Sequence, residues 1–193
     1  MTPKRAVFFD RDGVLNKAVV KNGRPYPPDD ATSLVITVGA AGLLTELREL
    51  GFLLICVTNQ PDIARGLRTQ ADVMAICDRV KFELALDDLL ICPHDNRDDC
   101  PCRKPKPGML TAAAANWGVD LPSSWMGGDR AGDVGAGRNA GCRTIFIDYD
   151  YDEPKPEPPA DYTCRSLLES VHLIKEVTIH HENHKRFKGK IVR

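Results

Sequence analysis

The chain has 193 residues, 42% of them hydrophobic and 27% charged, a composition typical of a soluble globular protein with one domain and an ordinary core. Its net charge of −1 and its aromatic content of 6% give no electrostatic or stacking argument for binding nucleic acid. No apolar stretch approaches the roughly 20 residues that span a bilayer, and no signal peptide precedes the first motif, so we expect a cytoplasmic protein that binds no membrane.

The first predicted element is a buried strand, Ala6–Phe9, that runs into Asp10-Arg11-Asp12-Gly13. A short apolar run followed by acids and a glycine is typical of a parallel-sheet strand that ends in a loop. Ligands of such sheets bind outside the carboxyl ends of the strands. Two carboxylates one residue apart at that edge can share a hard cation while one of them faces a substrate. Taken alone, the pair is better explained by solvation of a strand end.

Residues 17–34 follow this motif and contain the sequence KNGRPYPPDD. The glycine and the prolines indicate an irregular, stiff loop. The loop either reaches over the site and contributes to specificity or is an inert surface excursion.

A second predicted strand, 52–57, ends at Thr58-Asn59-Gln60. A hydroxyl and two amides at a strand end can hydrogen-bond phosphoryl oxygens without adding charge. A third strand is predicted at 87–92, and a fourth ends at Gly128-Asp129, with Asp133 four residues further on. Each pattern has an ordinary structural explanation, but their joint occurrence indicates one site.

The third predicted strand leads into a cluster of metal-ligand residues, Cys92, His94, Cys100 and Cys102. Three thiolates and an imidazole within eleven residues suit tetrahedral Zn²⁺, and four protein ligands leave no place for water, which favours a structural site. Disulfides are the alternative. The zinc loop, residues 92–102, directly precedes Arg103 and Lys104, so the metal would stiffen the segment that carries these cations. The remaining cysteines, at 56, 77, 142 and 164, are expected to be buried.

The rest of the pattern alternates helix and strand. Helices are predicted at 39–50, 70–86, 107–117, 133–140 and 166–176, and a fifth strand at 143–147. This alternation predicts an α/β fold with a doubly wound parallel sheet. Residues 151–159 are rich in proline and indicate an extended surface connector. We expect one domain, 1–176, followed by a basic, flexible tail, 177–193, for which an oligomer contact or a weak site for an anionic partner are the alternatives.

Four segments together resemble the haloacid dehalogenase superfamily of phosphohydrolases: FFDRDGVLN, VTNQPDIARG, CPHDNRDDCPCRKPKPGM and GGDRAGD. Within it they are similar to the heptose 1,7-bisphosphate 7-phosphatases and the related histidinol-phosphate phosphatases, over nearly all of the chain up to about residue 176. The resemblance implies a Rossmann-like fold with a small zinc-binding loop and no large cap domain.

The resemblance also implies roles for individual residues. Asp10 would be the nucleophile and Asp12 the general acid/base, and Mg²⁺ would be bound by Asp10, Asp129 and the backbone carbonyl of Asp12. Thr58 and Lys104 would steady the transferring phosphoryl group. The expected substrate contacts are Asn59, Gln60, Arg65, Arg103 and Arg130. Asp133 either supports the metal site or caps a helix.

The predicted function is therefore Mg²⁺-dependent hydrolysis of a small phosphomonoester through an aspartyl-phosphate intermediate. The preferred substrate is D-glycero-D-manno-heptose 1,7-bisphosphate, losing its 7-phosphate in carbohydrate metabolism. Pro61-Asp62 departs from the family's usual Ser-Gly, which removes an N–H donor and adds a negative charge that Arg65 could offset. Histidinol phosphate is the alternative substrate, and nucleic-acid end processing is a distant alternative function. We expect a monomer, although the sequence leaves an oligomer open.

Overall fold

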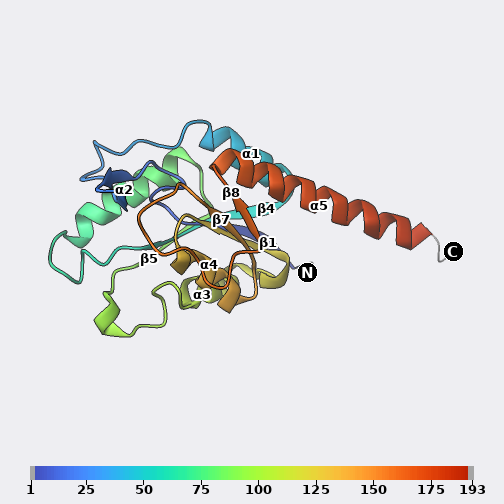
Figure 1. Ribbon diagram of the computed structural model, residues 1–193. Coiled ribbons are helices and arrows are strands. Elements are labelled where there is room, and N and C mark those ends of the chain that lie inside the picture. The colour runs from blue at the N-terminus through green and yellow to red at the C-terminus, as the bar shows by residue number, and fades with distance from the viewer. Residues whose placement is uncertain (1–2, 191–193) are drawn as a thin grey trace.

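The computed structural model describes the backbone of residues 3–190 and the side chains of residues 3–181. Six parallel strands form a central sheet in the order β5-β4-β1-β6-β7-β8 (Figure 1). Their bounds are β1 Arg5–Phe9, β4 Phe52–Asn59, β5 Asp88–Cys92, β6 Trp125–Gly128, β7 Arg143–Ile147 and β8 Tyr162–Cys164. The order, with β1 in the middle and the chain winding outward on both sides, confirms the predicted doubly wound α/β fold.

Helices cover both faces of this sheet (Figure 1). Their bounds are α1 Ala40–Glu49, α2 Gln70–Glu83, α3 Gly108–Trp117, α4 Ala131–Ala140 and α5 Leu167–Lys190, and two short 3-10 turns, η1 Asn96–Asp98 and η2 Leu121–Ser123, lie in the connections. The alternation of side chains along β1 divides the core into two layers. Val7 and Phe9 pack in the layer that includes α1, α2 and α5, whereas Ala6 and Phe8 pack in the layer that includes α3 and α4.

Two elements differ from the sequence-based expectation at the end of the chain. β8 was not predicted, because three residues flanked by turn-forming sequence carry too little periodicity. The last helix, predicted to end at residue 176, runs to Lys190 as one element. Thr178 is buried, so the packed part of the helix also extends beyond the predicted end. None of the helices within the described residues combines the length and the apolar character that crossing a membrane requires.

A short antiparallel hairpin interrupts the loop that follows β1. Its strands are β2 Val19–Lys21 and β3 Arg24–Tyr26, joined by Asn22 and Gly23 with φ of 52° and 74°. Positive φ at both central residues is the mark of a type I′ turn, for which Asn-Gly is a favoured pair. The prediction of an irregular loop over these residues was therefore wrong, and the Asn-Gly pair was the signal that identifies the hairpin.

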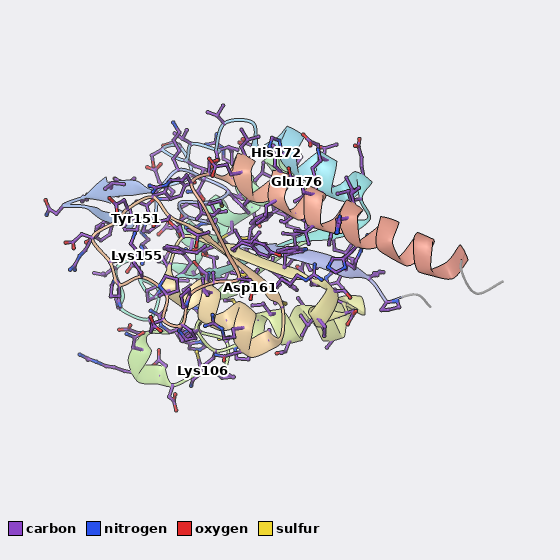
Figure 2. The ribbon with its side chains drawn as sticks, turned by 45° about the vertical axis from the view of Figure 1, so that its right-hand side comes forward. Lys106, Tyr151, Lys155, Asp161, His172 and Glu176 are labelled. Carbon is purple, nitrogen blue, oxygen red and sulfur yellow. The ribbon has the colours of Figure 1, made fainter. Side chains whose placement is uncertain are left out.

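The connector between β7 and β8 forms no helix or strand, as predicted. It folds against the end of the molecule that carries the hairpin. Figure 2 shows Tyr151 and Lys155 near one another at this end, away from His172 and Glu176 of α5. The backbone N–H of Asp152 donates to the carbonyl of Gly23 at 2.9 Å, so the connector and the hairpin turn are directly joined.

Candidate active site

Three neighbouring strands of the sheet end in polar residues at one edge. Asp10 follows β1, Thr58 lies near the end of β4, and Asp129 follows β6. The Asp10 N–H donates to Gly127 O of β6 at 3.0 Å, which fixes the exit of β1 beside that strand. Because β1 lies between β4 and β6, this edge is the point where the winding of the sheet reverses. Ligands of open α/β sheets bind at such points.

A buried lysine joins two acids of this edge. Lys104 Nζ lies 2.8 Å from Asp10 Oδ1 and 2.6 Å from Asp133 Oδ1, and it donates to Val57 O at 2.7 Å. Burial alone would lower the pKa of Lys104, but the two carboxylates outweigh it and keep the pKa above its ordinary value. The lysine therefore carries a fixed positive charge against Asp10.

Asp10 keeps a raised pKa in spite of that partner. Burial raises the pKa of Asp10, Lys104 lowers it, and the charges of Asp133 and Asp12 raise it; together they bring the pKa to about 6. The Asp10 carboxylate also accepts the N–H of Arg11 at 2.8 Å. A carboxylate in this surrounding is held in one orientation and lacks the water that would screen it.

Asp129 is buried, and neither oxygen of its carboxylate has a hydrogen-bond partner among the residues that the structure describes. Burial and the charges of Asp10 and Asp133 raise its pKa well above the ordinary range. Ligand oxygens of these three acids lie within 4.8 Å of one another. Three hard oxygen donors, one from each acid and one of them on a buried carboxylate without a hydrogen-bond partner, fit a bound Mg²⁺. Asp133 thus belongs to the cluster, while it also accepts the N–H of Arg130 at 3.0 Å as the cap of α4.

The side chain of Asp12 lies outside that cluster and is held by three other side chains. Arg11 donates to both of its carboxylate oxygens, at 2.8 and 3.1 Å. Asn16 Nδ2 donates to it at 3.1 Å and Gln60 Nε2 at 2.9 Å. Arg11 is fully buried and also contacts Cys77 Sγ at 3.0 Å. Sequence analysis missed the roles of Arg11 and Asn16, although both lie within the first motif.

The two amides that follow β4 have protein partners. Gln60 Nε2 also donates to Thr58 Oγ1 at 3.0 Å. Asn59 makes two hydrogen bonds of 3.1 Å to the backbone of Lys104, one in each direction. Thr58, Asn59 and Gln60 all line the cavity described below. Asn59 therefore fixes the segment that carries Lys104, in addition to any contact with a substrate.

The four zinc-ligand candidates converge in space. The sulfurs of Cys92, Cys100 and Cys102 lie 3.2–3.6 Å apart, and His94 Nδ1 lies 3.3 Å from Cys102 Sγ. These S–S separations are far longer than the disulfide bond of about 2.05 Å. Three sulfurs and a nitrogen around one point fit a tetrahedral Zn²⁺ site without an open position. The cluster is the zinc loop predicted from the sequence.

The loop passes directly from this cluster to the active-site cations. Arg103 donates to Asn96 Oδ1 at 2.7 Å and to His94 O at 3.1 Å, so both of its partners come from the zinc loop. The backbone N–H of Gly108, which begins α3, donates to Pro101 O at 3.1 Å. The position of Arg103 and Lys104 therefore depends on the fold of the loop.

The other two residues predicted to contact the substrate, Arg65 and Arg130, form ion pairs with acids. Arg65 pairs with Asp95 at 2.8 Å and with Asp62 at 3.5 Å. Arg130 lies 3.6 Å from Glu153 and donates to the carbonyl of Pro25 in the hairpin. Both arginines still line the cavity. Asp62, which replaces a small residue expected from the family, thus has its charge offset by Arg65.

A cavity of about 920 Å³ opens above the acids, at the upper end of the range of about 300–1,000 Å³ for small-molecule sites. It brings together every predicted catalytic and substrate-binding residue. It is further lined by hairpin residues that sequence analysis did not assign to the site, Arg24, Pro25 and Tyr26.

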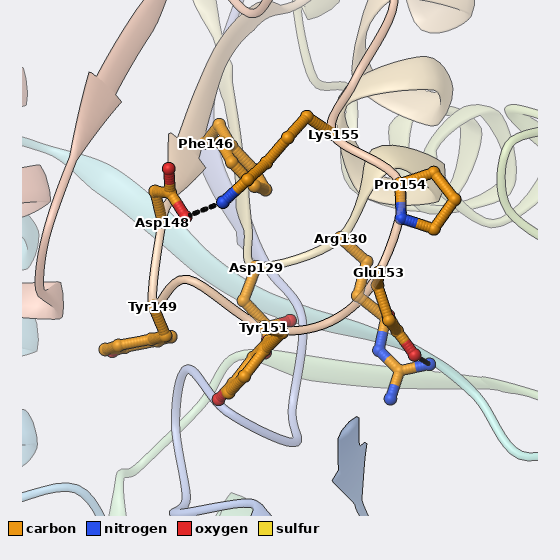
Figure 3. Close-up of a pocket in the computed structure, with 9 residues that line it drawn as sticks. All are labelled: Asp129, Arg130, Phe146, Asp148, Tyr149, Tyr151, Glu153, Pro154 and Lys155. Carbon is orange, nitrogen blue, oxygen red and sulfur yellow. Dashed lines mark hydrogen bonds and ion pairs between the residues drawn. The ribbon is translucent and has the colours of Figure 1, made fainter. Parts of the chain in front are cut away.

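A smaller recess of about 10 Å³ is lined by Asp129 and by residues of the connector (Figure 3). Tyr151 lies beside Asp129, and burial and the charge of Asp129 raise the pKa of its phenol. Glu153 stands next to Arg130 in the same view. The connector therefore closes one side of the acid cluster, a role that its proline-rich sequence does not reveal.

Known proteins are similar to this chain in sequence and in fold. The sequence model of the HAD-hydrolase-like family matches residues 101–170. The D-glycero-beta-D-manno-heptose-1,7-bisphosphate 7-phosphatases of Pasteurella multocida and Escherichia coli K12 are each 33% identical to the chain. Each alignment covers 89% of this chain, and 97% and 94% of the two relatives.

Solved structures agree with the sequence relatives. A D,D-heptose 1,7-bisphosphate phosphatase from B. bronchiseptica, determined with magnesium and phosphate, superposes with a TM-score of 0.73 at 26% identity, over 89% of this chain and 98% of that one. A putative HAD-like phosphatase from Mesorhizobium loti has a TM-score of 0.72 at 27% identity, over 91% and 88% of the two chains. The chain is a phosphatase that belongs to the haloacid dehalogenase superfamily, in the group that contains the D-glycero-beta-D-manno-heptose-1,7-bisphosphate 7-phosphatases.

Proposed function

We propose that the protein removes the 7-phosphate of D-glycero-D-manno-heptose 1,7-bisphosphate through an aspartyl-phosphate intermediate on Asp10. The observation that carries the chemistry is the position of Asp10, between Lys104 at 2.8 Å and the orphaned carboxylate of Asp129, beneath a cavity of about 920 Å³. The substrate is supported by the relatives that span nearly all of the chain and carry that activity in their names.

The metal has a defined set of candidate ligands. Asp10, Asp129 and the backbone carbonyl of Asp12 would hold Mg²⁺, with Asp133 supporting the cluster. When bound, Mg²⁺ supplies positive charge that offsets the repulsion between the carboxylates and a phosphate dianion. Lys104, which is ion-paired with Asp10, contributes a second positive charge. The Thr58 hydroxyl can donate a hydrogen bond to a phosphoryl oxygen. Positioning and charge of this kind account for most of the catalysis of phosphoryl transfer.

The reaction then proceeds in two displacements. An oxygen of Asp10 attacks phosphorus in line, and the bond from phosphorus to the sugar oxygen breaks while Asp12 gives that oxygen a proton. Asp12 next takes a proton from water, which attacks the phosphorus of the aspartyl phosphate and frees Asp10. General acid/base catalysis contributes about 10²–10⁴-fold. The bonds from Arg11, Asn16 and Gln60 keep Asp12 oriented for both transfers.

In this proposal the zinc loop positions active-site residues and takes no part in the chemistry. Four protein ligands fill a tetrahedral Zn²⁺ site, so the metal takes no substrate. Its contribution is to hold Arg103 and Lys104 in place. Thiolate ligands require reduced cysteines, which favours the cytoplasm as the compartment. We also propose a monomer, because this chain by itself supplies every predicted catalytic and substrate-binding residue of the cavity.

A substrate panel tests the proposed function. Purified protein with Mg²⁺ would be assayed for phosphate release from heptose 1,7-bisphosphate, heptose 7-phosphate, histidinol phosphate and other sugar phosphates. We expect the highest kcat/KM with the bisphosphate, and ³¹P NMR should show that the 1-phosphate stays on the product. A higher kcat/KM for histidinol phosphate, or release of the 1-phosphate first, would refute the substrate assignment and leave the phosphatase chemistry standing.

A further inference from the structure

Each acid that lines the large cavity forms an ion pair with a lysine or arginine of the protein. Each has a lysine or arginine nitrogen within 3.6 Å. The pairs are Asp10 and Asp133 with Lys104, Asp12 with Arg11, Asp62 with Arg65, and Glu153 with Arg130. The cavity therefore offers no unpaired acid to a positively charged substrate.

The cations of the cavity wall divide into two groups. Lys104, Arg65 and Arg130 are paired with these acids, whereas Arg103 and Arg24 have no carboxylate partner among the described side chains. Arg103 is nevertheless fixed by two neutral acceptors of the zinc loop. Across the part of the chain whose side chains are described, the Arg24 guanidinium has neither a hydrogen bond nor an ion pair. Among the described residues, Arg24 therefore provides the cavity wall with a positive charge that no other protein group engages.

The hairpin holds Arg24 on the cavity side. Arg24, Pro25 and Tyr26 all line the cavity, and Arg24 and Tyr26, two apart on the strand, share a face. Pro25 between them is buried. The Gly23 carbonyl accepts the N–H of Asp152 at 2.9 Å, and the Pro25 carbonyl accepts a bond from Arg130. The backbone on both sides of Arg24 is thus fixed to the body of the protein, while its side chain is free to bind.

We infer that Arg24 binds a second anionic group of the substrate, at the end remote from the phosphoryl group transferred to Asp10. The planar guanidinium presents paired donors that match a phosphate oxygen pair. The cavity volume of about 920 Å³ leaves room for a sugar between the two anions. This inference rests on the proposed function. It assigns the 1-phosphate of the proposed substrate to the hairpin rather than to the segment 61–65, where Arg65 is already paired with two acids.

Paired substrates test this assignment. Wild type, Arg24→Gln, Arg24→Lys and Lys21→Gln would each be assayed with heptose 1,7-bisphosphate and heptose 7-phosphate, and with fructose 1,6-bisphosphate and fructose 6-phosphate. Lys21→Gln is the matched control, because Lys21 pairs with Arg24 in the hairpin register and is not part of the cavity lining. The readout is the ratio of kcat/KM for each bisphosphate to that for its monophosphate.

We expect Arg24→Gln to lower this ratio about tenfold or more, chiefly by raising KM for the bisphosphate, with partial recovery in Arg24→Lys and the wild-type ratio in Lys21→Gln. An unchanged ratio in Arg24→Gln, an equal loss in Lys21→Gln, or a wild type without preference for either bisphosphate would each overturn the inference. A wild type that prefers the fructose pair, with the same dependence on Arg24, would uphold it and refute the heptose assignment. Far-UV circular dichroism would verify that each variant is folded.

Discussion

Gly13 and Asp129 are in such close contact that a Cβ built on Gly13 would lie 1.9 Å from Asp129 Oδ2. The loop after β1 therefore presses its backbone directly against the carboxylate that follows β6. Gly13 also has a φ of +86°, a conformation that costs an L-residue about 1–2 kcal/mol. Two separate requirements, space and backbone conformation, demand glycine at the point where the two motifs meet.

Gly13→Ala is expected to disable the acid cluster. The methyl group must push Asp129 or the loop aside, so we predict a fall in kcat/KM of about 100-fold or more, together with a weaker Mg²⁺ dependence. Gly51→Ala is the matched control, since Gly51 has a φ of +82° and no atom within 4 Å of a built Cβ. It should lose about 1–2 kcal/mol of unfolding free energy in urea and keep its activity. Wild-type kinetics in Gly13→Ala would contradict the proposed contact.

Asp129→Ala is expected to impair Mg²⁺-dependent activity and to raise the melting temperature of the metal-free protein. Without the carboxylate, half-maximal activity should need at least ~10-fold more Mg²⁺, or activity should be lost. In EDTA the variant should melt higher than wild type, because an unsatisfied buried polar group costs about 1–3 kcal/mol, or roughly 2–10 °C at this chain length. Asp148→Ala, at the end of β7 and outside the cluster, should leave the Mg²⁺ titration unchanged. An unaltered titration in Asp129→Ala would exclude the residue as a ligand.

Loss of the zinc site is expected to harm substrate handling more than global folding. In small zinc fingers metal binding is the folding energy, about 10–16 kcal/mol. Here the core layer that includes α1, α2 and α5 contains no zinc-loop residue, and the other layer consists mostly of residues outside the loop, beside Cys92, Cys100 and Cys102. Cys100→Ser should therefore raise KM and lower kcat while far-UV circular dichroism is largely preserved. Cys142→Ala, which removes a thiol outside the cluster, should retain the metal.

Metal analysis provides the second readout for the zinc site. Wild type should contain about one zinc per chain, and Cys100→Ser much less. Fully active, zinc-free wild type would defeat this account, as would a disulfide between two of the four ligand positions in the active protein.

The sheet and most of the site could be predicted from the sequence because each piece of evidence is local. Asp10, Thr58 and Asp129 each follow an apolar run of strand length, and the rules of parallel sheets bring such strand ends to one edge. The zinc ligands lie within one segment of eleven residues, so their spacing alone indicates a metal. The alternation of strands and helices could be predicted without knowing which residues are in contact.

The remainder depends on contacts that local patterns do not encode. Nothing in the sequence around Arg11 indicates that its guanidinium is buried against Cys77 of α2, because that packing joins segments 66 residues apart. Tyr151 reaches Asp129 from a proline-rich connector with no regular pattern. The hairpin that carries Arg24 is a different case, since the Asn-Gly turn is visible in the sequence and was outweighed by the prolines around it.

The central claim is that Asp10 carries the phosphoryl group, and trapping the intermediate tests it most directly. Borohydride reduces an acyl phosphate to an alcohol, so protein quenched during turnover should contain homoserine in place of Asp10, located by mass spectrometry of the peptide. Asp10→Asn should give no reduced residue, a kcat lower by about 10³-fold or more and an intact fold. We predict reduction at Asp10 alone, dependent on substrate and Mg²⁺; reduction at another carboxylate, or none during rapid turnover, would contradict the account.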